Sequence, residues 1–180
     1  SVEAGATPLF QHGHFLDTPH PEPVAIDLSA VYPGLDRVRI DFHTPTELKE
    51  HGAPVREPSF AVLFARLRDR VANLRALYGD GPLENIDFKG LNERASAIRT
   101  EALHLRDESI ERRSSRTGQR HPLGGFTGHA IYAGGLGEFA PWLLAGAWTG
   151  IGRQTVWGKG AIGVSFEDKN RMVSEAASAS

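Results

Sequence analysis

The sequence predicts an α+β protein in which two helices back one antiparallel sheet. Apolar and polar residues alternate at 37–42 and at 126–132, which is the pattern of strands with one buried face. Apolar residues recur at helical spacing over 60–78 and 136–148. Strands and helices in this mixture favour an antiparallel sheet that carries its helices on one face.

The first strand and the first helix lie in the N-terminal half. The strand over 37–42 is expected to end at 43–46, where His-Thr-Pro-Thr breaks the alternation. Ser59 is the expected cap of the helix, and Gly79 closes it. The apolar stripe of this helix consists of Phe60, Leu63, Phe64, Leu67, Val71, Leu74 and Tyr78. The charged residues off the stripe are expected to form a solvated face: Arg66, Arg68, Asp69, Arg70 and Arg75.

The C-terminal half is expected to hold a hairpin, a helix and a last strand. The predicted elements are a short helix near 91–98, hairpin strands at 103–116 and 126–132, a helix over 136–148 and a strand over 161–166. The hairpin would turn at Thr117-Gly118 or in the basic segment behind it. The helix would pack through Phe139, Leu143, Leu144 and Ala147. The resulting order, βαββαβ, is the ferredoxin-like arrangement.

Composition divides the chain into three parts. Residues 1–34 are rich in Pro, His and Gly and show little periodicity, so they are expected to be an irregular lead-in left from a preceding domain. Residues 35–168 are expected to form the ferredoxin-like domain. Residues 169–180 end in an Ala/Ser-rich run and are expected to be a disordered tail.

The composition also excludes several classes of function. The chain has 180 residues and no cysteine, which excludes disulfides, thiol catalysis and cysteine-based zinc sites. No apolar run approaches the roughly 18 residues that a membrane span needs. His12, His14 and His20 lie close together without a carboxylate pattern, which favours exposed loop histidines over a metal site. We therefore expect a cytoplasmic protein with no cofactor and no membrane partner.

Positive charge is concentrated in one part of the chain. Residues 1–111 contain 12 Lys/Arg and 18 Asp/Glu, whereas residues 112–160 contain six Lys/Arg against Glu138 alone, a net charge of +5. Such asymmetry indicates a local surface for a polyanion. The predicted hairpin supplies the first candidate contacts: Arg112, Arg113, Arg116 and Arg120. A mobile, solvated turn would explain this cluster equally well.

A glycine-rich loop over 150–160 supplies the other candidates, with the spacing G-x-G, five residues, G-x-G. A nucleotide-binding P-loop has four residues between its glycines, and the dinucleotide fingerprint needs a glycine where Thr155 stands, so neither ATP nor NAD fits. A loop of this kind can lay its amides along a phosphate backbone, or it can simply turn tightly beside a sheet. The candidate RNA contacts are Gly150, Gly152, Arg153, Gln154, Thr155, Gly158, Lys159 and Gly160.

The residues by themselves do not identify a catalytic group. His121 and His129 are the imidazoles of the basic region, and either can titrate near neutral pH and act as a base, although His129 also fits the face of a strand. Trp142, Trp148 and Trp157 are expected to anchor the core or the loop. Trp157 is the one placed to stack on an RNA base.

Five sequence blocks occur in an order that is more specific than any one block. Ile40–Lys49 joins a strand to the motif T-P-x-x-L-K, and Ser59–Gly79 is a helix with the rhythm R-L…R…L…Y-G. Gly124–Gly134 contains G-F-x-G-x-x-x-Y-x-G, and Phe139–Trp148 contains F-x-P-x-L-L-x-G-x-W. Followed by the glycine-rich loop Gly150–Gly160, these blocks resemble the C-terminal domain of CRISPR-associated repeat-processing endoribonucleases in the RAMP superfamily.

The resemblance implies that the chain binds CRISPR repeat RNA and, further, other CRISPR-associated proteins. In a complete enzyme it implies metal-independent cleavage, in which a ribose 2′-hydroxyl attacks the adjacent phosphate. Family members usually carry two ferredoxin-like domains, with the catalytic histidine in the N-terminal one. This chain is therefore expected to be a C-terminal domain that lacks the catalytic base. The alternative is a RAMP-type scaffold that holds RNA without cleaving it, and a nucleotide-binding enzyme is a third hypothesis.

Overall fold

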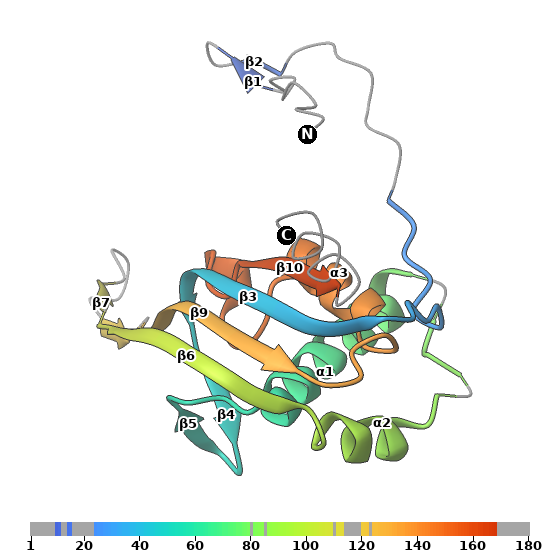
Figure 1. Cartoon of the computed structure of the whole chain (residues 1–180). Helices are drawn as coiled ribbons and strands as arrows, with labels where there is room; N and C mark the ends of the chain where they lie inside the picture. Colours follow the sequence, from blue (N-terminus) through green and yellow to red (C-terminus); the bar gives the residue numbers. More distant parts are fainter. Residues whose placement is uncertain are drawn as a thin grey trace.

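The computed structural model describes residues 10–11, 14–15, 24–79, 81–84, 86–109, 111–113, 120–122 and 124–168. Its main sheet has four strands in the order β10-β3-β9-β6, and neighbouring strands are antiparallel (Figure 1). The strands are β3 (Leu35–Thr46), β6 (Arg99–Glu108), β9 (Gly125–Ala133) and β10 (Ile162–Asp168). This arrangement confirms the predicted α+β, ferredoxin-like fold.

Helices and short strands complete the described fold. The helices are α1 (Phe60–Tyr78), α2 (Phe88–Ala95) and α3 (Ala140–Thr149), and the 3-10 turn η1 is Thr155–Trp157. The short strands pair as β1 (Phe10–Gln11) with β2 (His14–Phe15), β4 (Leu48–Glu50) with β5 (Ala53–Val55), and β7 (Glu111–Arg113) with β8 (Arg120–Pro122). Helix α2 begins earlier than the predicted 91–98.

The core lies between one face of the sheet and helices α1 and α3 (Figure 1). The side chains of Ile40 and Phe42 point inward from β3 and are buried, as their alternation predicts. Aromatic rings join the two helices: the ring centroid of Phe64 lies 4.8 Å from that of Phe139 and 5.9 Å from that of the buried Trp142. The other face of the sheet carries polar residues.

Helix α1 has the ends that the sequence predicts. The Ser59 hydroxyl accepts a hydrogen bond from the Val62 amide at 3.4 Å, and the helix closes at Gly79. The last turn extends past the core, so Tyr78 is exposed and does not continue the buried stripe.

Two arginines of α1 are not solvated as predicted. The Arg70 guanidinium donates hydrogen bonds to the Thr149 carbonyl at 3.1 and 3.2 Å. The guanidinium carbon of Arg68 lies 5.3 Å from the ring centroid of Phe88. Arg70 thereby satisfies a carbonyl at the end of α3, directly before the glycine-rich loop.

Strand β3 continues through the segment that was expected to end it. A register shift lets the strand pass Pro45, and Thr46 then pairs with Phe126 on β9. The hairpin strand predicted over 103–116 is instead divided into β6 and the short β7. The predicted turn at 117–118 lies outside the described residues.

Helix α3 begins later than predicted and buries a partly different side. Leu144 and Ala147 are exposed, contrary to the prediction. Gly146 faces α1 instead, so closely that a Cβ at this position would lie 2.7 Å from the Leu67 side chain. Because Gly146 is on the side of α3 that faces α1, Trp148 is 73% exposed and is not a core anchor.

The segment before β3 contacts the domain. The Tyr32 amide donates to the Gly137 carbonyl at 3.1 Å, which ties the end of the expected lead-in to the segment before α3. The tail expected at 169–180 lies outside the described residues. Within the described part of the chain, no helix is both long enough and apolar enough to cross a membrane.

Candidate functional site

The glycine-rich loop is attached to the end of β3. The Gly160 amide donates to the Pro45 carbonyl at 3.2 Å, and the Arg153 amide donates to the Glu47 carbonyl at 3.1 Å. The Thr-Pro-Thr-Glu segment at 44–47, which we call the loop seat, therefore holds both ends of the loop. This contact joins two of the sequence blocks that carry the family resemblance.

Glycine is required where the loop meets itself and its seat. At Gly160 (φ +73°), a Cβ would lie 1.9 Å from the Ile151 carbonyl oxygen, and at Gly152 (φ +83°) it would lie 2.5 Å from the Glu47 carbonyl oxygen. The Ile151 amide donates to the Gly160 carbonyl at 2.8 Å and closes the loop. Gly150 ends α3, and its amide donates to the Gly146 carbonyl. These glycines allow the loop to fold tightly.

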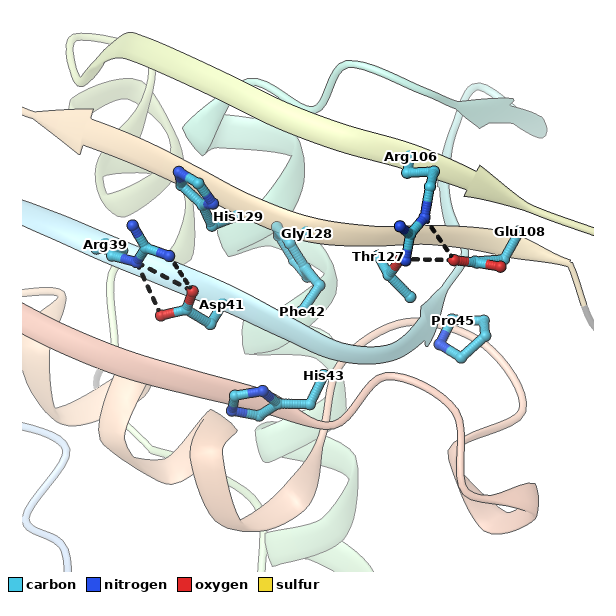
Figure 2. A pocket seen from close by; sticks show the side chains of 10 residues that line it. All are labelled: Arg39, Asp41, Phe42, His43, Pro45, Arg106, Glu108, Thr127, Gly128 and His129. Atoms are coloured by element: carbon cyan, nitrogen blue, oxygen red, sulfur yellow. Dashed lines mark hydrogen bonds and ion pairs between the residues drawn. The ribbon is translucent and has the colours of Figure 1, made fainter.

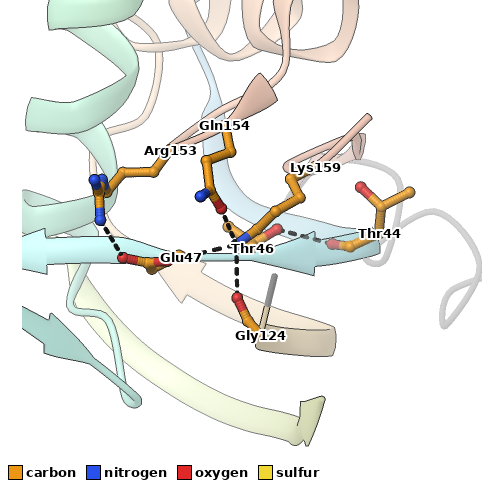
Figure 3. Close-up of polar contacts among 7 residues, drawn as sticks. All are labelled: Thr44, Thr46, Glu47, Gly124, Arg153, Gln154 and Lys159. Atoms are coloured by element: carbon orange, nitrogen blue, oxygen red, sulfur yellow. Dashed lines mark hydrogen bonds and ion pairs between the residues drawn. The ribbon is translucent and has the colours of Figure 1, made fainter. Parts of the chain in front are cut away.

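The glycine-rich loop contains a buried lysine, Lys159, whose contacts are drawn in Figure 3. The side chain of Lys159 is only 4% exposed. Its ammonium group donates to the Gly124 carbonyl at 2.6 Å and to Gln154 Oε1 at 3.0 Å, and it lies 3.4 Å from Glu47 Oε2. The three N–H groups of the ammonium thus have three protein acceptors.

Glu47 connects the two cations of the loop. Its Oε1 accepts a hydrogen bond from the Arg153 guanidinium at 2.9 Å, while Oε2 faces Lys159. Burial alone would raise the pKa of the Glu47 carboxyl, but the hydrogen bond from Arg153 and the charge of Lys159 outweigh it and hold that pKa below its ordinary value. Arg153 differs from Lys159 because its side chain is 53% exposed.

The outer turn of the loop, which we define as residues 153–158, faces outward. Gln154 has a left-handed backbone conformation (φ +60°), which residues other than glycine rarely adopt. The 3-10 turn η1 follows it. The exposed members of the outer turn are Arg153, Val156, Trp157 and Gly158.

The candidate contacts of the loop therefore divide into two groups. Arg153, Gln154, Thr155 and Gly158 lie in the outer turn, and Gly150 and Gly152 are half-buried beside it. Lys159 and Gly160 are buried. A phosphate could reach the outer turn without any rearrangement, whereas the Lys159 ammonium group is buried on the inner side of the loop. Contact of these residues with RNA stays a prediction.

The basic hairpin is next to the lysine. Strands β7 and β8 pair Arg112 with His121 and Arg113 with Arg120. Arg116 lies outside the described residues. Gly124, whose carbonyl accepts from Lys159, lies just after β8 and directly before β9. The backbone therefore brings the base of the hairpin close to the glycine-rich loop.

A second candidate site is a shallow hollow of about 570 Å³ on the open face of the sheet (Figure 2). It is lined by Arg39, Asp41, Phe42, His43, Pro45, Arg106, Glu108, Thr127, Gly128 and His129. Of these, His129 is the only residue that the sequence nominated. The alternation of Arg39, Asp41 and His43 on the polar side of β3 is the signal that could have located it.

The charges in this hollow are balanced. Arg39 pairs with Asp41 at 2.7 Å and Arg106 pairs with Glu108 at 3.0 Å. The ring of His129 lies 4.7 Å from that of His104 on the neighbouring strand. Burial, followed by the charges of Arg39 and His104, lowers the pKa of His129, so its imidazole is neutral near pH 7. Among the described residues, no group of three His, Asp or Glu could hold a metal ion.

A family comparison tests the resemblance drawn from the sequence. The sequence profile of the family described as CRISPR-associated endoribonuclease Cas6 matches residues 40–162. The chain belongs to this Cas6 family. The match begins in β3 and ends in β10, so it includes both the loop seat and the glycine-rich loop. The predicted family is thus confirmed, while the assignment to a C-terminal domain stays a prediction.

Solved structures share the fold. A Thermus thermophilus Cas6 is 19% identical with a TM-score of 0.57, and the alignment covers 77% of this chain and 56% of that one. A Cas6 product complex gives the same identity and TM-score, with 77% and 53% coverage. A partial Cas6-RT-Cas1–Cas2 complex is 14% identical with a TM-score of 0.52, covering 76% and 23%. No curated protein matches. The chain spans about half the length of the Cas6 structures it matches.

Proposed function

We propose that this chain binds CRISPR repeat RNA as the C-terminal domain of a precursor CRISPR RNA endoribonuclease. The observation that supports this most directly is the glycine-rich loop, which its seat holds in one shape while the outer turn stays exposed. A fixed, exposed turn that carries the Arg153 guanidinium suits a phosphate backbone. Membership of the Cas6 family makes repeat RNA the expected polyanion.

The proposed RNA surface consists of the outer turn and the basic hairpin. Both belong to the segment 112–160, which carries a net charge of +5. The open face of the sheet is a weaker candidate, because its four arginines lie outside this basic segment and each pairs with a carboxylate. These arginines are Arg37, Arg39, Arg99 and Arg106. Arg153 also pairs with a carboxylate, that of Glu47, and would have to exchange or share it on binding phosphate.

In the full enzyme, the proposed reaction is attack of a ribose 2′-oxygen on the adjacent phosphorus. A base takes the proton of the 2′-hydroxyl, the bond from phosphorus to the 5′-oxygen breaks, and an acid protonates the leaving oxygen, which yields a 2′,3′-cyclic phosphate and a 5′-hydroxyl. We assign the base to a domain other than the one described, since the family resemblance places it there. The role of this chain is then to hold and orient the RNA. We also propose a cytoplasmic location and contacts with other CRISPR-associated proteins.

A binding and cleavage assay tests this function. The chain is mixed with the labelled repeat RNA encoded next to its gene, or with an RNA of the same length and composition in scrambled order, in the presence of EDTA. We expect tighter binding of the repeat and no efficient cleavage. Equal affinity for both RNAs would refute the proposed function. Fast, specific cleavage that is lost in His121→Ala or His129→Ala would place the active site inside this chain.

A further inference from the structure

We infer that Lys159 is a positioning residue, whose ammonium group fixes the glycine-rich loop relative to the base of the basic hairpin and does not contact RNA. This inference rests on the proposed function, because it concerns the two surfaces that would hold the repeat. It changes the role that the sequence predicts for this lysine.

Burial is the first reason. A lysine that contacts phosphate keeps its ammonium group in solvent, where its long side chain can reach the ligand. Lys159 is 4% exposed, and its charge would be costly in that position without compensation. The Glu47 carboxylate and two carbonyl-type oxygens supply that compensation. A phosphate could reach the ammonium group only if the loop left its seat.

The origin of the three acceptors is the second reason. Glu47 belongs to the loop seat, Gln154 to the outer turn, and Gly124 to the segment that leads from β8 to β9. One ammonium group thus joins three segments that are far apart in the sequence. Since the outer turn and the hairpin are the two proposed RNA surfaces, this group sets the distance between them.

The backbone of Gln154 is the third reason. Its left-handed conformation is unfavourable for a residue with a side chain, and the hydrogen bond from Lys159 to Gln154 Oε1 opposes its relaxation. Without Lys159, the turn that carries Arg153 would lose this support. RNA would then have to order the turn as it binds, which lowers affinity.

Salt dependence separates this role from a phosphate contact. Log affinity falls linearly with log salt, and each phosphate that a cation neutralises adds about 0.7 to the magnitude of this negative slope for single-stranded nucleic acid; we call this magnitude the slope. Loss of a phosphate contact therefore lowers both the affinity and the slope. Loss of a positioning contact lowers the affinity and leaves the slope unchanged, because the number of counterions released is the same.

The experiment compares three variants for binding of the repeat RNA at several salt concentrations. Lys159→Met should weaken binding about tenfold with an unchanged slope, the size expected for a lost charged hydrogen-bond group. Arg153→Ala should lower the slope by about 0.7. Lys89→Met, which removes a lysine that is 89% exposed on α2, is the control and should change neither quantity. A fall of the slope by about 0.7 in Lys159→Met would overturn the inference.

Two further measurements keep the test decisive. In Lys159→Met, hydrogen exchange of the free protein should become faster at the amides of 151–160. Exchange in β3 and β9 should stay unchanged. An unchanged exchange rate in the loop would overturn the inference even if no RNA binds. If that variant does not fold, Gln154→Ala replaces it, with the same expected exchange and slope. Lys159→Arg should not restore affinity, because a planar guanidinium is larger than an ammonium group and directs its N–H groups differently from the three bonds that Lys159 makes, whereas it would restore a phosphate contact.

Discussion

Replacing Gly160 with alanine should damage the loop far more than replacing Gly158. Both glycines have left-handed backbones, with φ +73° at Gly160 and +83° at Gly158. An alanine in this region costs about 1–2 kcal/mol at either position. The surroundings differ, because a Cβ at Gly158 would meet nothing within 4 Å, whereas one at Gly160 would lie 1.9 Å from the Ile151 carbonyl oxygen. The pair therefore separates backbone strain from steric overlap.

The overlap at Gly160 involves backbone atoms, which cannot move aside as a flexible side chain can. Relief requires the loop to open, which breaks the hydrogen bond from the Ile151 amide and weakens the one to the Pro45 carbonyl. At about 1 kcal/mol for each bond, in addition to the backbone strain, Gly160→Ala should cost about 3 kcal/mol of unfolding free energy. Gly158→Ala should cost about 1 kcal/mol.

Urea denaturation gives both unfolding free energies, and binding of the repeat RNA in the absence of urea gives the functional consequence. We expect Gly158→Ala to keep most of its affinity, because its loop stays on the seat. Gly160→Ala should lose most of it. Equal costs in the two variants, or an intact affinity in Gly160→Ala, would refute the argument that this glycine closes the loop against its seat.

Three further outcomes are expected. Trp142→Ala should cost about 3–5 kcal/mol in urea denaturation, because its ring is buried against α1, while the exposed Trp148→Ala should stay within about 0.5 kcal/mol of the wild type. The depressed pKa of Glu47 stabilises the fold above the ordinary carboxyl pKa, and this contribution is lost as pH falls through the folded value, so wild type and Glu47→Gln should converge in stability in acid. A gap that does not narrow at all as pH falls from neutral through and below the ordinary carboxyl pKa would contradict this. His129→Ala should leave RNA binding unchanged in the same binding assay, because its hollow has balanced charges.

The elements that could be predicted from the sequence are those with local signals. The alternation in β3, the stripe of α1 and its caps Ser59 and Gly79 depend on neighbours within a few residues, and the structure confirms them. The family could be predicted as well, because the order of the five blocks is specific and the family profile matches the same region.

The errors arise where tertiary contacts override local pattern. Pro45 has no backbone N–H to donate within a sheet, so it predicts the end of a strand, but a register shift lets β3 continue past it. Leu144 and Ala147 fit a packed stripe, yet Gly146 approaches α1 closely and these two side chains are exposed. Lys159 is a residue type that often binds phosphate, but its side chain is buried like that of a structural residue. No spacing in the sequence reports burial of this kind.

Two of the five blocks that carry the resemblance act as one unit in the structure. The T-P-x-x-L-K motif and the glycine-rich loop are separated by about a hundred residues, and each could be interpreted alone, as a strand end and as a phosphate loop. The Ala161 amide donates to the Thr44 hydroxyl at 2.9 Å, and the Gly160 amide donates to the Pro45 carbonyl, so the motif receives the loop along its length. A glycine loop that binds a polyanion through its outer turn needs such support on its inner side, because glycine gives it no stiffness of its own. The loop seat therefore belongs to the proposed RNA site even though none of its residues is expected to contact RNA.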